Sequence, residues 1–282
     1  MLSGLILERY GDMGSAYTCR RLSEEASSLG MSAVVTGVMD TVVSEDGSLY
    51  NRGVRMEGTD FVLNRYKHGH VKDEINGLAR RAYNPLDAFN TYVDKYEQIR
   101  RLNPSSVGVP RSMLVNRGTV FDTVVEVLSA PFVLKGLRGS EGREVFLVGS
   151  EEEMRSALLS CPGEEFLCQE YIGEMPGRDM RVFSVRGNPV AVMERYNPDG
   201  FRANVAQGAR VKRLDVREEV RVTCSEIYEQ TGLDFAGVDL LYGRDGLVFC
   251  EVNVMPGIKG MESATGVNIA RLVMETVAGD LS

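Results

Sequence analysis

Three oxygen-bearing side chains near the end of the chain, Asp239, Glu251 and Asn253, have the types and the spacing of a cation site. Residues 236–241 and 247–253 are two apolar stretches joined by a short polar turn, which predicts a β-hairpin. Carboxylate and amide oxygens on one rigid hairpin suit a hard divalent ion such as Mg²⁺, which leaves some coordination positions to water and substrate phosphates. The pattern predicts a magnesium site, and an exposed hairpin whose acids face solvent is the alternative.

The register of this hairpin decides whether the two carboxylates meet. A three-residue loop, 244–246, with Gly246 in the left-handed conformation, places Asp239 directly opposite Glu251. Asn253 then projects from the same face, because side chains alternate along a strand. Two carboxylates opposed across a ladder repel each other, so we expect a positive group between them.

A second hairpin is predicted over 131–148, where an apolar strand ends in Lys135. Its connection is rich in glycine and includes Gly139, Ser140 and Gly142. Backbone N–H groups at such a flexible tip can donate to phosphate oxygens while the lysine supplies charge. This order of strand, lysine and glycines favours a phosphate-binding loop over a plain exposed one.

Apolar periodicity predicts the elements that must position these residues. A strand, helix, strand order at the N-terminus indicates an α/β unit, and its glycines do not form GxGxxG, so no dinucleotide site is expected there. A helix capped by Asp73 is predicted to run to about Tyr83. The other predicted elements are strands 5–7, 31–36, 60–65 and 166–172, helices 15–29, 87–102, 121–129, 151–160, 217–230 and 267–277, and a hairpin over 182–195.

A resemblance to the ATP-grasp ligases is carried by four segments, AGVDLL (236–241), EVN (251–253), PGIKG (256–260) and TGVNIA (265–270). Among these ligases the chain is most similar to the RimK type, which adds amino acids to a carboxylate. The resemblance implies an α/β protein with the ATP-grasp fold, in which two α+β subdomains enclose ATP. The expected domains are an N-terminal pre-ATP-grasp α/β domain (1–84), a central lid subdomain (85–168) and a C-terminal subdomain with the metal hairpin (169–282).

The resemblance also implies roles for individual residues. In that family the equivalents of Asp239, Glu251 and Asn253 hold the magnesium ions of ATP, and Mn²⁺ is an alternative ion. The segment that corresponds to 169–172 meets the adenine edge, and an acid at the position of Asp179 meets the ribose. The nucleotide-binding residues implied in this way are Lys95, Lys135, Gly139, Ser140, Gly142, Gln169, Glu170, Tyr171, Ile172, Asp179 and Asn204.

The basic residues between the two hairpins are implied to face the reacting groups. Arg181 corresponds to an arginine near those groups, and Arg195, Arg202 and Asn204 are expected to face the γ-phosphate and the acyl phosphate. The three arginines are the candidate catalytic residues. Lys259, in the loop after the metal strand, and Arg195 are candidates for binding a substrate carboxylate, which favours glutamate as the amino acid.

Composition limits the class of the protein. A chain of 282 residues with 43% apolar and 26% charged residues is typical of globular proteins. The net charge of −8 argues against nucleic acid as the main partner. No apolar run reaches the roughly 20 residues of a membrane helix, and the N-terminus lacks the order of a signal peptide, so we expect a cytoplasmic protein without a membrane partner. The five cysteines lack CxxC spacing and fit packed thiols.

The reaction implied by the resemblance is ligation by an ADP-forming acid–amino-acid ligase. The γ-phosphate of ATP activates a carboxylate to an acyl phosphate, and an amine then displaces phosphate to give an amide. The expected partners are ATP, an amino acid, with glutamate favoured, and an acceptor carboxylate on a protein, peptide, carrier protein or cofactor; homo-oligomer formation is left open. The alternatives are a ligase that joins two amino acids, an ATP-grasp kinase of small molecules, and a regulatory module that binds nucleotide without turnover.

Overall fold

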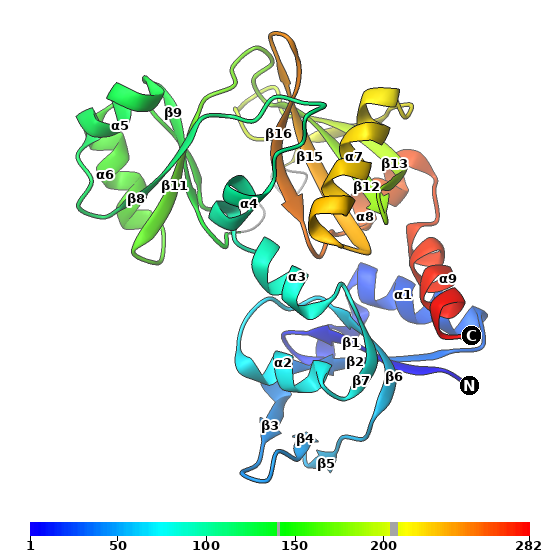
Figure 1. Cartoon of the computed structure of the whole chain (residues 1–282). Coiled ribbons are helices and arrows are strands. Elements are labelled where there is room, and N and C mark those ends of the chain that lie inside the picture. The colour runs from blue at the N-terminus through cyan, green and yellow to red at the C-terminus, as the bar shows by residue number, and fades with distance from the viewer. Residues whose placement is uncertain (140–141, 204–207) are drawn as a thin grey trace.

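The computed structural model of the protein describes residues 1–139, 142–203 and 208–282. Figure 1 shows three groups of elements: an N-terminal group at the bottom of the view, a smaller group at the upper left and a large sheet at the upper right. Ser140 and Asn204, which the resemblance assigns to nucleotide binding, lie outside the described residues.

Four parallel strands form the sheet of the N-terminal group in the order β2-β1-β6-β7. Parallel neighbours need crossover connections, which α1 supplies between β1 and β2 and α2 between β6 and β7. The first unit extends to one side of β1 and the second to the other side, so the winding of the sheet reverses between β1 and β6. The elements are β1 (Ser3–Glu8), η1 (Gly11–Ser15), α1 (Tyr17–Ser28), β2 (Ser32–Gly37), η2 (Val38–Asp40), β6 (Thr59–Asn64), α2 (His70–Asn76) and β7 (Ala79–Tyr83).

A small antiparallel sheet of β3 (Thr41–Val43), β4 (Leu49–Asn51) and β5 (Val54–Arg55) projects from the N-terminal group, away from the large sheet (Figure 1). Apolar periodicity does not indicate these strands. They are two or three residues long, and alternation over so few positions is not distinguishable from a loop.

The helix predicted from Asp73 to about Tyr83 is wrong. α2 already begins at His70 and ends before its C-cap, Gly77, and β7 follows over Ala79–Tyr83. This last segment pairs in parallel with β6, and Tyr83 is buried. The sheet therefore decides a conformation that the local sequence leaves open.

The single helix predicted over 87–102 is also wrong, because the chain forms α3 (Leu86–Tyr92) and α4 (Lys95–Arg101). Asp94 between them is the N-cap of α4. Its backbone is extended and its carboxylate accepts a hydrogen bond from the N–H group of Tyr96 at 3.0 Å. Such a cap satisfies N–H groups that the start of a helix leaves free, so the helix restarts at the lysine assigned to the ATP phosphates.

The smaller group, which we call the lid, is an antiparallel sheet in the order β10-β9-β11-β8 with a core of its own. Strands β9 and β10 form the hairpin that the sequence predicts, and Lys135 lies opposite Val145 in it. Ser150 caps α6 by accepting a hydrogen bond from the N–H group of Glu153 at 3.3 Å. The elements are β8 (Ser112–Asn116), α5 (Phe121–Leu128), β9 (Phe132–Gly136), β10 (Val145–Val148), α6 (Glu151–Ser160) and β11 (Glu165–Glu170).

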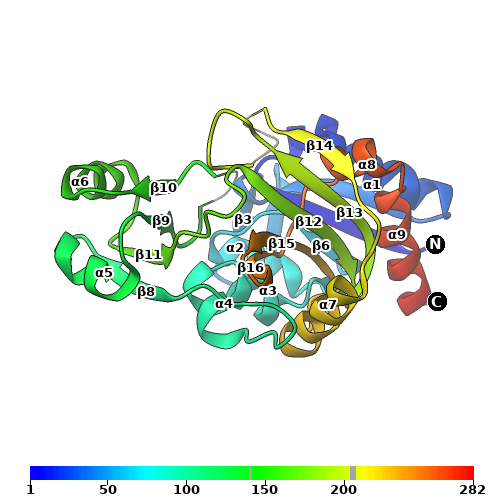
Figure 2. The same cartoon turned by 90° about the horizontal axis from the view of Figure 1, so that it is seen from above.

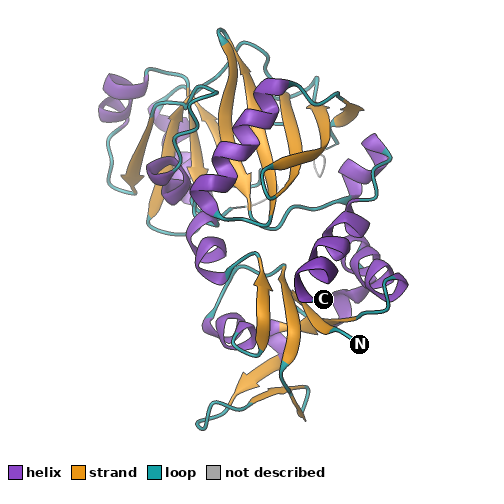
Figure 3. Cartoon of the chain, turned by 45° about the vertical axis from the view of Figure 1, so that its right-hand side comes forward, coloured by secondary structure: helices purple, strands orange, loops and turns teal. Residues whose placement is uncertain are grey.

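Five antiparallel strands form the large sheet in the order β14-β13-β12-β15-β16. α7 packs Val220 and Ile227 against it, and Phe89 of α3 joins the same core; Figure 3 shows α7 lying across the sheet. Figure 2, seen from above, shows the lid to one side of this sheet. The elements are β12 (Arg178–Val185), β13 (Asn188–Tyr196), β14 (Arg210–Arg213), α7 (Glu218–Thr231), β15 (Phe235–Gly243), β16 (Gly246–Asn253), α8 (Lys259–Thr265) and α9 (Ile269–Leu281).

The metal hairpin has the predicted pairing but not the predicted turn. Strands β15 and β16 place Asp239 directly opposite Glu251. Gly243 pairs with Gly246, so the turn between them contains two residues and the three-residue loop is wrong. Gly246 has a positive φ of 138°, a conformation that favours glycine.

A β-bulge next to Asp239 reconciles the shorter turn with the predicted pairing. Leu240 pairs with Phe249, whereas Asp239 pairs with Glu251, so Cys250 is the extra residue of β16. A bulge shifts the register by one residue and turns the strand locally. The opposition of the two acids therefore depends on the bulge as well as on the turn.

One core joins the N-terminal group to the large sheet. Leu22 of α1, Met274 of α9 and Phe183 of β12 belong to the same buried cluster, and Figure 1 shows α1 and α9 side by side. Among the described residues no helix is long and apolar enough to cross a membrane. The five cysteines are free and four of them are buried, as expected for packed thiols. The predicted division into three domains stays an interpretation of the sequence.

Candidate functional site

Five charged residues lie in two neighbouring rows across the large sheet. β12 pairs Arg181 with Asp239, and β15 pairs Asp239 with Glu251. Two positions along β12, Asp179 pairs with Arg195 of β13. Side chains two residues apart on a strand share one face, so strand register alone brings all five onto one side of the sheet.

Asp239 is a buried carboxylate held by two arginines. Arg181 donates to it through Nε at 2.6 Å and also through Nη2, and Arg195 donates through Nη2 at 3.0 Å. Arg195 makes a second, bidentate contact with Asp179, with both N···O distances at 2.6 Å. Asp239 and Arg195 are each 2% exposed. The positive charge that the sequence analysis expects beside the opposed acids is supplied at Asp239 by these arginines.

The two buried acids of this cluster titrate differently. Burial raises the pKa of Asp179 to about 6, although the charge of Arg195 acts to lower it. Burial also acts to raise the pKa of Asp239, but its contacts with Arg181 and Arg195 outweigh burial and the pKa is lowered. Asp239 is therefore ionised at neutral pH, as a cation ligand has to be.

Glu251 and Lys95 connect the metal hairpin to the lid. The Lys95 Nζ lies 3.4 Å from Glu251 Oε2, and the Asn253 Nδ2 lies 3.5 Å from Glu251 Oε1. The same Lys95 Nζ donates to the carbonyl of Gly139 at 2.8 Å, and its backbone N–H donates to the carbonyl of Leu137 at 2.9 Å. The first residue of α4 thus joins the glycine-rich loop to an acid of β16.

A pocket of about 990 Å³, here called the first pocket, lies between lid residues such as Lys135 and large-sheet residues such as Asp239. Its lining includes all the described residues that the resemblance assigns to nucleotide binding, namely Lys95, Lys135, Gly139, Gly142, Gln169, Glu170, Tyr171, Ile172 and Asp179. The candidate catalytic and metal residues that also line it are Arg195, Arg202, Asp239 and Glu251. The fold brings together residues that come from both sheets and from α4.

Lys135 is a buried cation in the first pocket and is 8% exposed. Its Nζ lies 3.9 Å from the Cys250 Sγ, and no described carboxylate forms an ion pair with it. Burial of an ammonium group without an opposite charge is costly. A bound anionic group at this position would offset that cost.

Part of the wall of the first pocket is apolar. Val133 from the lid and Leu241 from the large sheet line it together with Ile172. β11 ends at Glu170, so the backbone of Tyr171 and Ile172 leaves the lid sheet beside these side chains. The backbone groups of Tyr171 and Ile172 have no backbone hydrogen-bond partner among the described residues. Together with the apolar side chains from two sheets they suit a planar, hydrogen-bonding ring.

The Glu144 side chain lies against Gly136 and Gly139, where a residue with a Cβ would clash with it. A Cβ on Gly136 would lie 2.1 Å from the Glu144 Oε2, and one on Gly139 would lie 2.7 Å from it. The N–H group of Gly136 donates to the carbonyl of Glu144 at 2.9 Å. Glu144 therefore closes the base of the hairpin.

A second pocket of about 1490 Å³ adjoins the first and shares Lys95, Gly139, Arg195 and Glu251 with it. The predicted residues that line only the second pocket are Arg181, Asn253 and Lys259. The Lys259 side chain is exposed and forms no hydrogen bond or ion pair with a described residue. The shared residues lie where a group bound in one pocket would meet a group bound in the other.

Two buried amides that sequence patterns do not single out hold the ends of the metal hairpin. Gln98 of α4 accepts from the N–H group of Val252 at 2.8 Å and donates to its carbonyl at 2.9 Å. Asn84 donates to the carbonyls of Phe235 and Val254 at 2.7 and 2.9 Å. A lone amide gives no sequence signal when its partners are 151 to 170 residues away.

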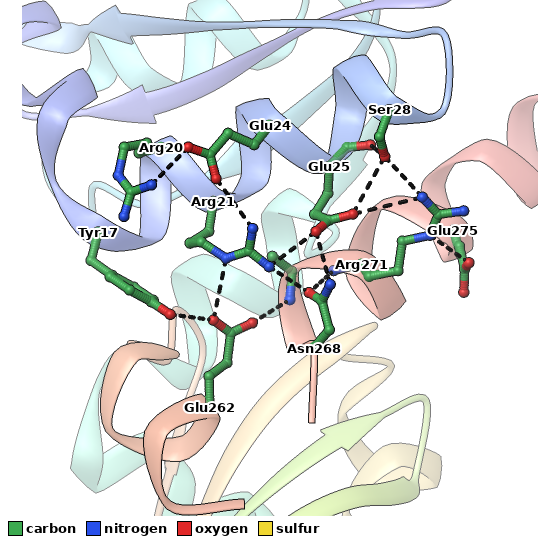
Figure 4. A network of polar contacts seen from close by, with 11 residues as sticks. Tyr17, Arg20, Arg21, Glu24, Glu25, Ser28, Glu262, Asn268, Arg271 and Glu275 are labelled. Carbon is green, nitrogen blue, oxygen red and sulfur yellow. Dashed lines mark hydrogen bonds and ion pairs between the residues drawn. The ribbon is translucent and has the colours of Figure 1, made fainter. Parts of the chain in front are cut away.

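A polar network fixes α8, which begins at Lys259, against α1 (Figure 4). The Tyr17 hydroxyl donates to Glu262 Oε2 at 2.7 Å, and the Arg21 Nε lies 3.5 Å from the same oxygen. Arg21 also donates through Nη2 to Asn268 Oδ1 at 2.8 Å. The network therefore holds the wall that carries Lys259 against the N-terminal group.

Asp239, Glu251 and Asn253 fit a hard cation in the chemistry of their donors. They offer carboxylate and amide oxygens, although both Asp239 oxygens are bonded to guanidinium groups. Among the described residues no group of three His, Cys, Asp or Glu side chains is arranged to hold a metal ion. The set suits an ion that receives further ligands from phosphates and water, and the metal role stays a prediction.

A profile described as a RimK-like ATP-grasp domain matches residues 93–277. The chain belongs to the RimK-like ATP-grasp family. A relative from Methanococcoides burtonii named "Probable alpha-L-glutamate ligase" is 31% identical over 274 residues, which cover 93% of this chain and 91% of the relative. A relative of the same name from Saccharophagus degradans is 31% identical over 275 residues, with the same coverage. The predicted class, an ADP-forming ATP-grasp carbon–nitrogen ligase, is confirmed.

Solved structures confirm the predicted ATP-grasp fold of this family member. The ATP-grasp ligase PsnB, solved with a phosphomimetic variant of its minimal precursor, Mg and ADP, has a TM-score of 0.71 at 16% identity and covers 100% of this chain and 99% of its own. D-alanyl-alanine synthetase A from Vibrio cholerae has a TM-score of 0.75 at 14% identity, with 99% and 98% covered. A RimK domain protein from Sphaerobacter thermophilus has a TM-score of 0.71 at 17% identity, with 98% and 100% covered.

Proposed function

We propose that this RimK-like protein activates an acceptor carboxylate with the γ-phosphate of ATP and adds an amino acid to it, with glutamate as the favoured amino acid. The observation that carries the proposal is Lys135, a buried cation without a described carboxylate partner, in a pocket that borders a second, cation-rich pocket. The first pocket suits a nucleotide and the second suits carboxylates. The shared border at Lys95, Arg195 and Glu251 is where transfer would occur.

ATP would lie in the first pocket with its base and its phosphates in chemically different places. The adenine suits the apolar wall that includes Val133 and Leu241, and the ribose suits the neighbourhood of Asp179. The phosphates suit Lys135, Lys95 and the glycine-rich loop. Phosphoryl transfer depends mostly on positioning and on neutralising charge, and these residues supply both.

Asp239, Glu251 and Asn253 are the residues that would hold Mg²⁺. When bound, the ion would neutralise phosphate charge and orient the γ-phosphate. Arg181 and Arg195 hold the Asp239 carboxylate in place within the sheet, and they keep it ionised. The chain thus prepares an acidic site beside the phosphate position.

The reaction then has two balanced steps. A carboxylate oxygen of the acceptor bonds to the γ-phosphorus while the bond to the ADP oxygen breaks, which gives an acyl phosphate and ADP. A neutral amine attacks the carbonyl carbon, phosphate leaves, and the amine loses a proton. Lys95 and Arg202 lie at the first pocket and would neutralise the transferring phosphoryl group, and removing one such group typically costs on the order of 3 kcal/mol of barrier.

Glutamate is favoured by two separate observations. Relatives that are 31% identical over almost the whole chain carry the name probable alpha-L-glutamate ligase. Lys259 presents a cation without a described partner to the second pocket. A carboxylate of glutamate is the chemical complement of that ammonium group.

Nucleotide product analysis tests the proposal. The protein is incubated with ATP, Mg²⁺ and glutamate, with and without candidate acceptors, alongside Asp239→Asn, Glu251→Gln and the control Asp245→Asn at the exposed tip of the same hairpin. We expect glutamate-dependent ADP formation that both site variants lose and the control retains. AMP formation would indicate an adenylate and overturn the mechanism, and amino-acid-independent turnover would favour a kinase.

A further inference from the structure

The N-terminal group contributes Thr18, Arg65 and Lys67 to the lining of the second pocket. The chain winds to one side from β1 to β2 and to the other side from β6 to β7, so the reversal lies between β1 and β6. In open parallel sheets, ligands bind outside the carboxyl ends of the strands at such a reversal. Here Glu8 ends β1 and Arg65 directly follows β6.

Two hydrogen bonds hold Arg65 at the carboxyl end of β6. Its Nε donates to Glu8 Oε1 at 2.9 Å, and its Nη1 donates to the carbonyl of Pro256 at 3.4 Å. The Arg65 side chain is 18% exposed and lines the second pocket. The Arg65 side chain also contacts the Cys19 thiol. Among the described residues no oxygen accepts a hydrogen bond from its Nη2, so this oriented guanidinium group keeps a donor for a bound ligand.

The second pocket carries an excess of positive charge. Its basic lining residues are Arg65, Lys67, Lys95, Arg181, Arg195 and Lys259, and Glu251 is the carboxylate among its lining residues. Four of these cations are in contact with acids. Within the described part of the chain, Lys67 and Lys259 form no ion pair, and the Lys67 Nζ donates to the carbonyl of Arg138. The pocket therefore suits a ligand with more than one negative charge.

Arg65 and Lys259 approach this pocket from different parts of the chain. Arg65 contacts Pro256, at the start of the loop that leads to Lys259. The contact of Tyr17 with Glu262, 2.7 Å long, fixes α8 on α1 (Figure 4). Protein contacts therefore hold both walls in place. A pocket with fixed cations can select a small molecule by the distance between its two negative charges.

We propose that Arg65 binds one carboxylate of the amino-acid substrate, so that the N-terminal group selects a dicarboxylic amino acid while Lys259 faces the other carboxylate. The inference rests on the proposed function and deepens it. A dicarboxylic amino acid with a neutral, attacking amine carries two negative charges, which matches the pocket. Arg65 is then a specificity-determining residue supplied from outside the segment that matches the family profile, residues 93–277.

Calorimetric binding of three probes tests this. L-glutamate, L-glutamine and the α-amide of L-glutamate are titrated into the full chain with Mg²⁺ and a non-hydrolysable ATP analogue. The variants are Arg65→Gln, Arg65→Lys and the control Arg80→Gln, which loses an ion pair of the same sheet at a side chain that is 63% exposed. We expect Arg65→Gln to weaken glutamate binding by about 10- to 100-fold, with Arg65→Lys intermediate and Arg80→Gln unchanged.

The pattern over the three probes separates recognition from a structural role. If Arg65 binds a carboxylate, Arg65→Gln weakens the binding of glutamate. It leaves unchanged the binding of the one amide that lacks this carboxylate. An equal loss for all three probes, no loss, or no binding of glutamate to the unmodified protein would overturn the inference. Failure of the proposed function is distinct, because glutamate would then bind without glutamate-dependent ADP formation.

Discussion

At the scale of residues, this RimK-like protein neutralises some buried charges with ion pairs and leaves others without a described partner. Asp239 is neutralised by Arg181 and Arg195, whereas Lys135 is buried without a described acidic partner. Natural proteins seldom bury an ammonium group in this way unless it has a function. We therefore expect the Lys135 ammonium group to lower the stability of the free protein and to favour catalysis.

Lys135→Met is predicted to stabilise the free protein and to damage nucleotide use. Replacing a buried, unpaired ammonium group by an apolar chain of similar length should raise the free energy of unfolding by about 1 kcal/mol. The loss of one phosphate contact should lower kcat/KM for ATP about 100-fold. Urea unfolding and steady-state kinetics measure the two effects.

Lys212→Met is the matched control for Lys135→Met, because Lys212 is exposed on the edge strand β14. It should change neither quantity. If Lys135→Met destabilised the free protein and left the KM for ATP unchanged, Lys135 would be a structural residue and the phosphate assignment would be wrong.

At the scale of elements, the break between α3 and α4 creates the meeting point of the lid and the metal hairpin. In one continuous helix the N–H group of Lys95 would bond within the helix. In the structure it donates to the carbonyl of Leu137 in the lid loop at 2.9 Å. Gln98, one turn further along α4, bonds both backbone groups of Val252 on the edge strand β16.

Gln98→Ala is predicted to loosen the strand that carries Glu251 and Asn253. Two backbone groups of Val252 lose their partner, so the free energy of unfolding should fall by about 2 kcal/mol. Mg²⁺-dependent ADP binding should weaken about 10-fold, as for residues that orient metal ligands. Calorimetry with and without Mg²⁺ measures this.

The comparison variant for Gln98→Ala is Gln230→Ala, whose exposed side chain accepts one hydrogen bond from the N–H group of Asn103 at 2.9 Å. It should leave ADP binding unchanged. Equal ADP affinity in Gln98→Ala and the unmodified protein, in the presence of Mg²⁺, would show that this bridge does not position the hairpin.

At the scale of the whole molecule, an ionic network joins the last helix to the N-terminal sheet and to the large sheet. Asp280 of α9 accepts from Arg186 Nη1 at 3.0 Å and from the Tyr83 hydroxyl at 2.9 Å. Arg81 and Arg186 also contact Asp234, at 3.0 and 2.8 Å. Hydrogen bonding to Arg186 is the main cause that lowers the pKa of Asp280 from its ordinary value of 3.8.

The lowered pKa of Asp280 predicts the pH range in which the network stabilises the fold. The contribution is fully present above the ordinary value and is lost as pH falls through the lowered pKa, because the native state then has to take up a proton. Asp280→Asn should cost about 2 kcal/mol of unfolding free energy at pH 7. The difference should shrink toward zero in acid.

Urea unfolding between pH 3 and pH 7 measures this dependence for the unmodified protein, Asp280→Asn and the exposed control Asp245→Asn. The control should follow the unmodified protein at every pH. A stability difference for Asp280→Asn that stayed constant from pH 7 to pH 3 would contradict the assignment.

Local sequence determined the parts of this molecule that depend on neighbours in the chain. The pairing of Asp239 with Glu251 within one hairpin was predicted correctly, although a two-residue turn and a β-bulge produce it in place of the predicted three-residue loop. The sequence also predicted the strand that carries Lys135, which is β9, and the helix 151–160, which is α6. These features need only local hydrogen bonds and side-chain periodicity.

Tertiary structure alone decided which distant charges meet. Arg195 reaches Asp239 because two strands flank β12, and Gln98 reaches Val252 because α4 packs on a sheet edge. Arg65 reaches the second pocket because the N-terminal sheet reverses its winding between β1 and β6. Such contacts join residues far apart in the sequence, and no periodicity within a segment encodes them, since burial and packing of the assembled sheets place them.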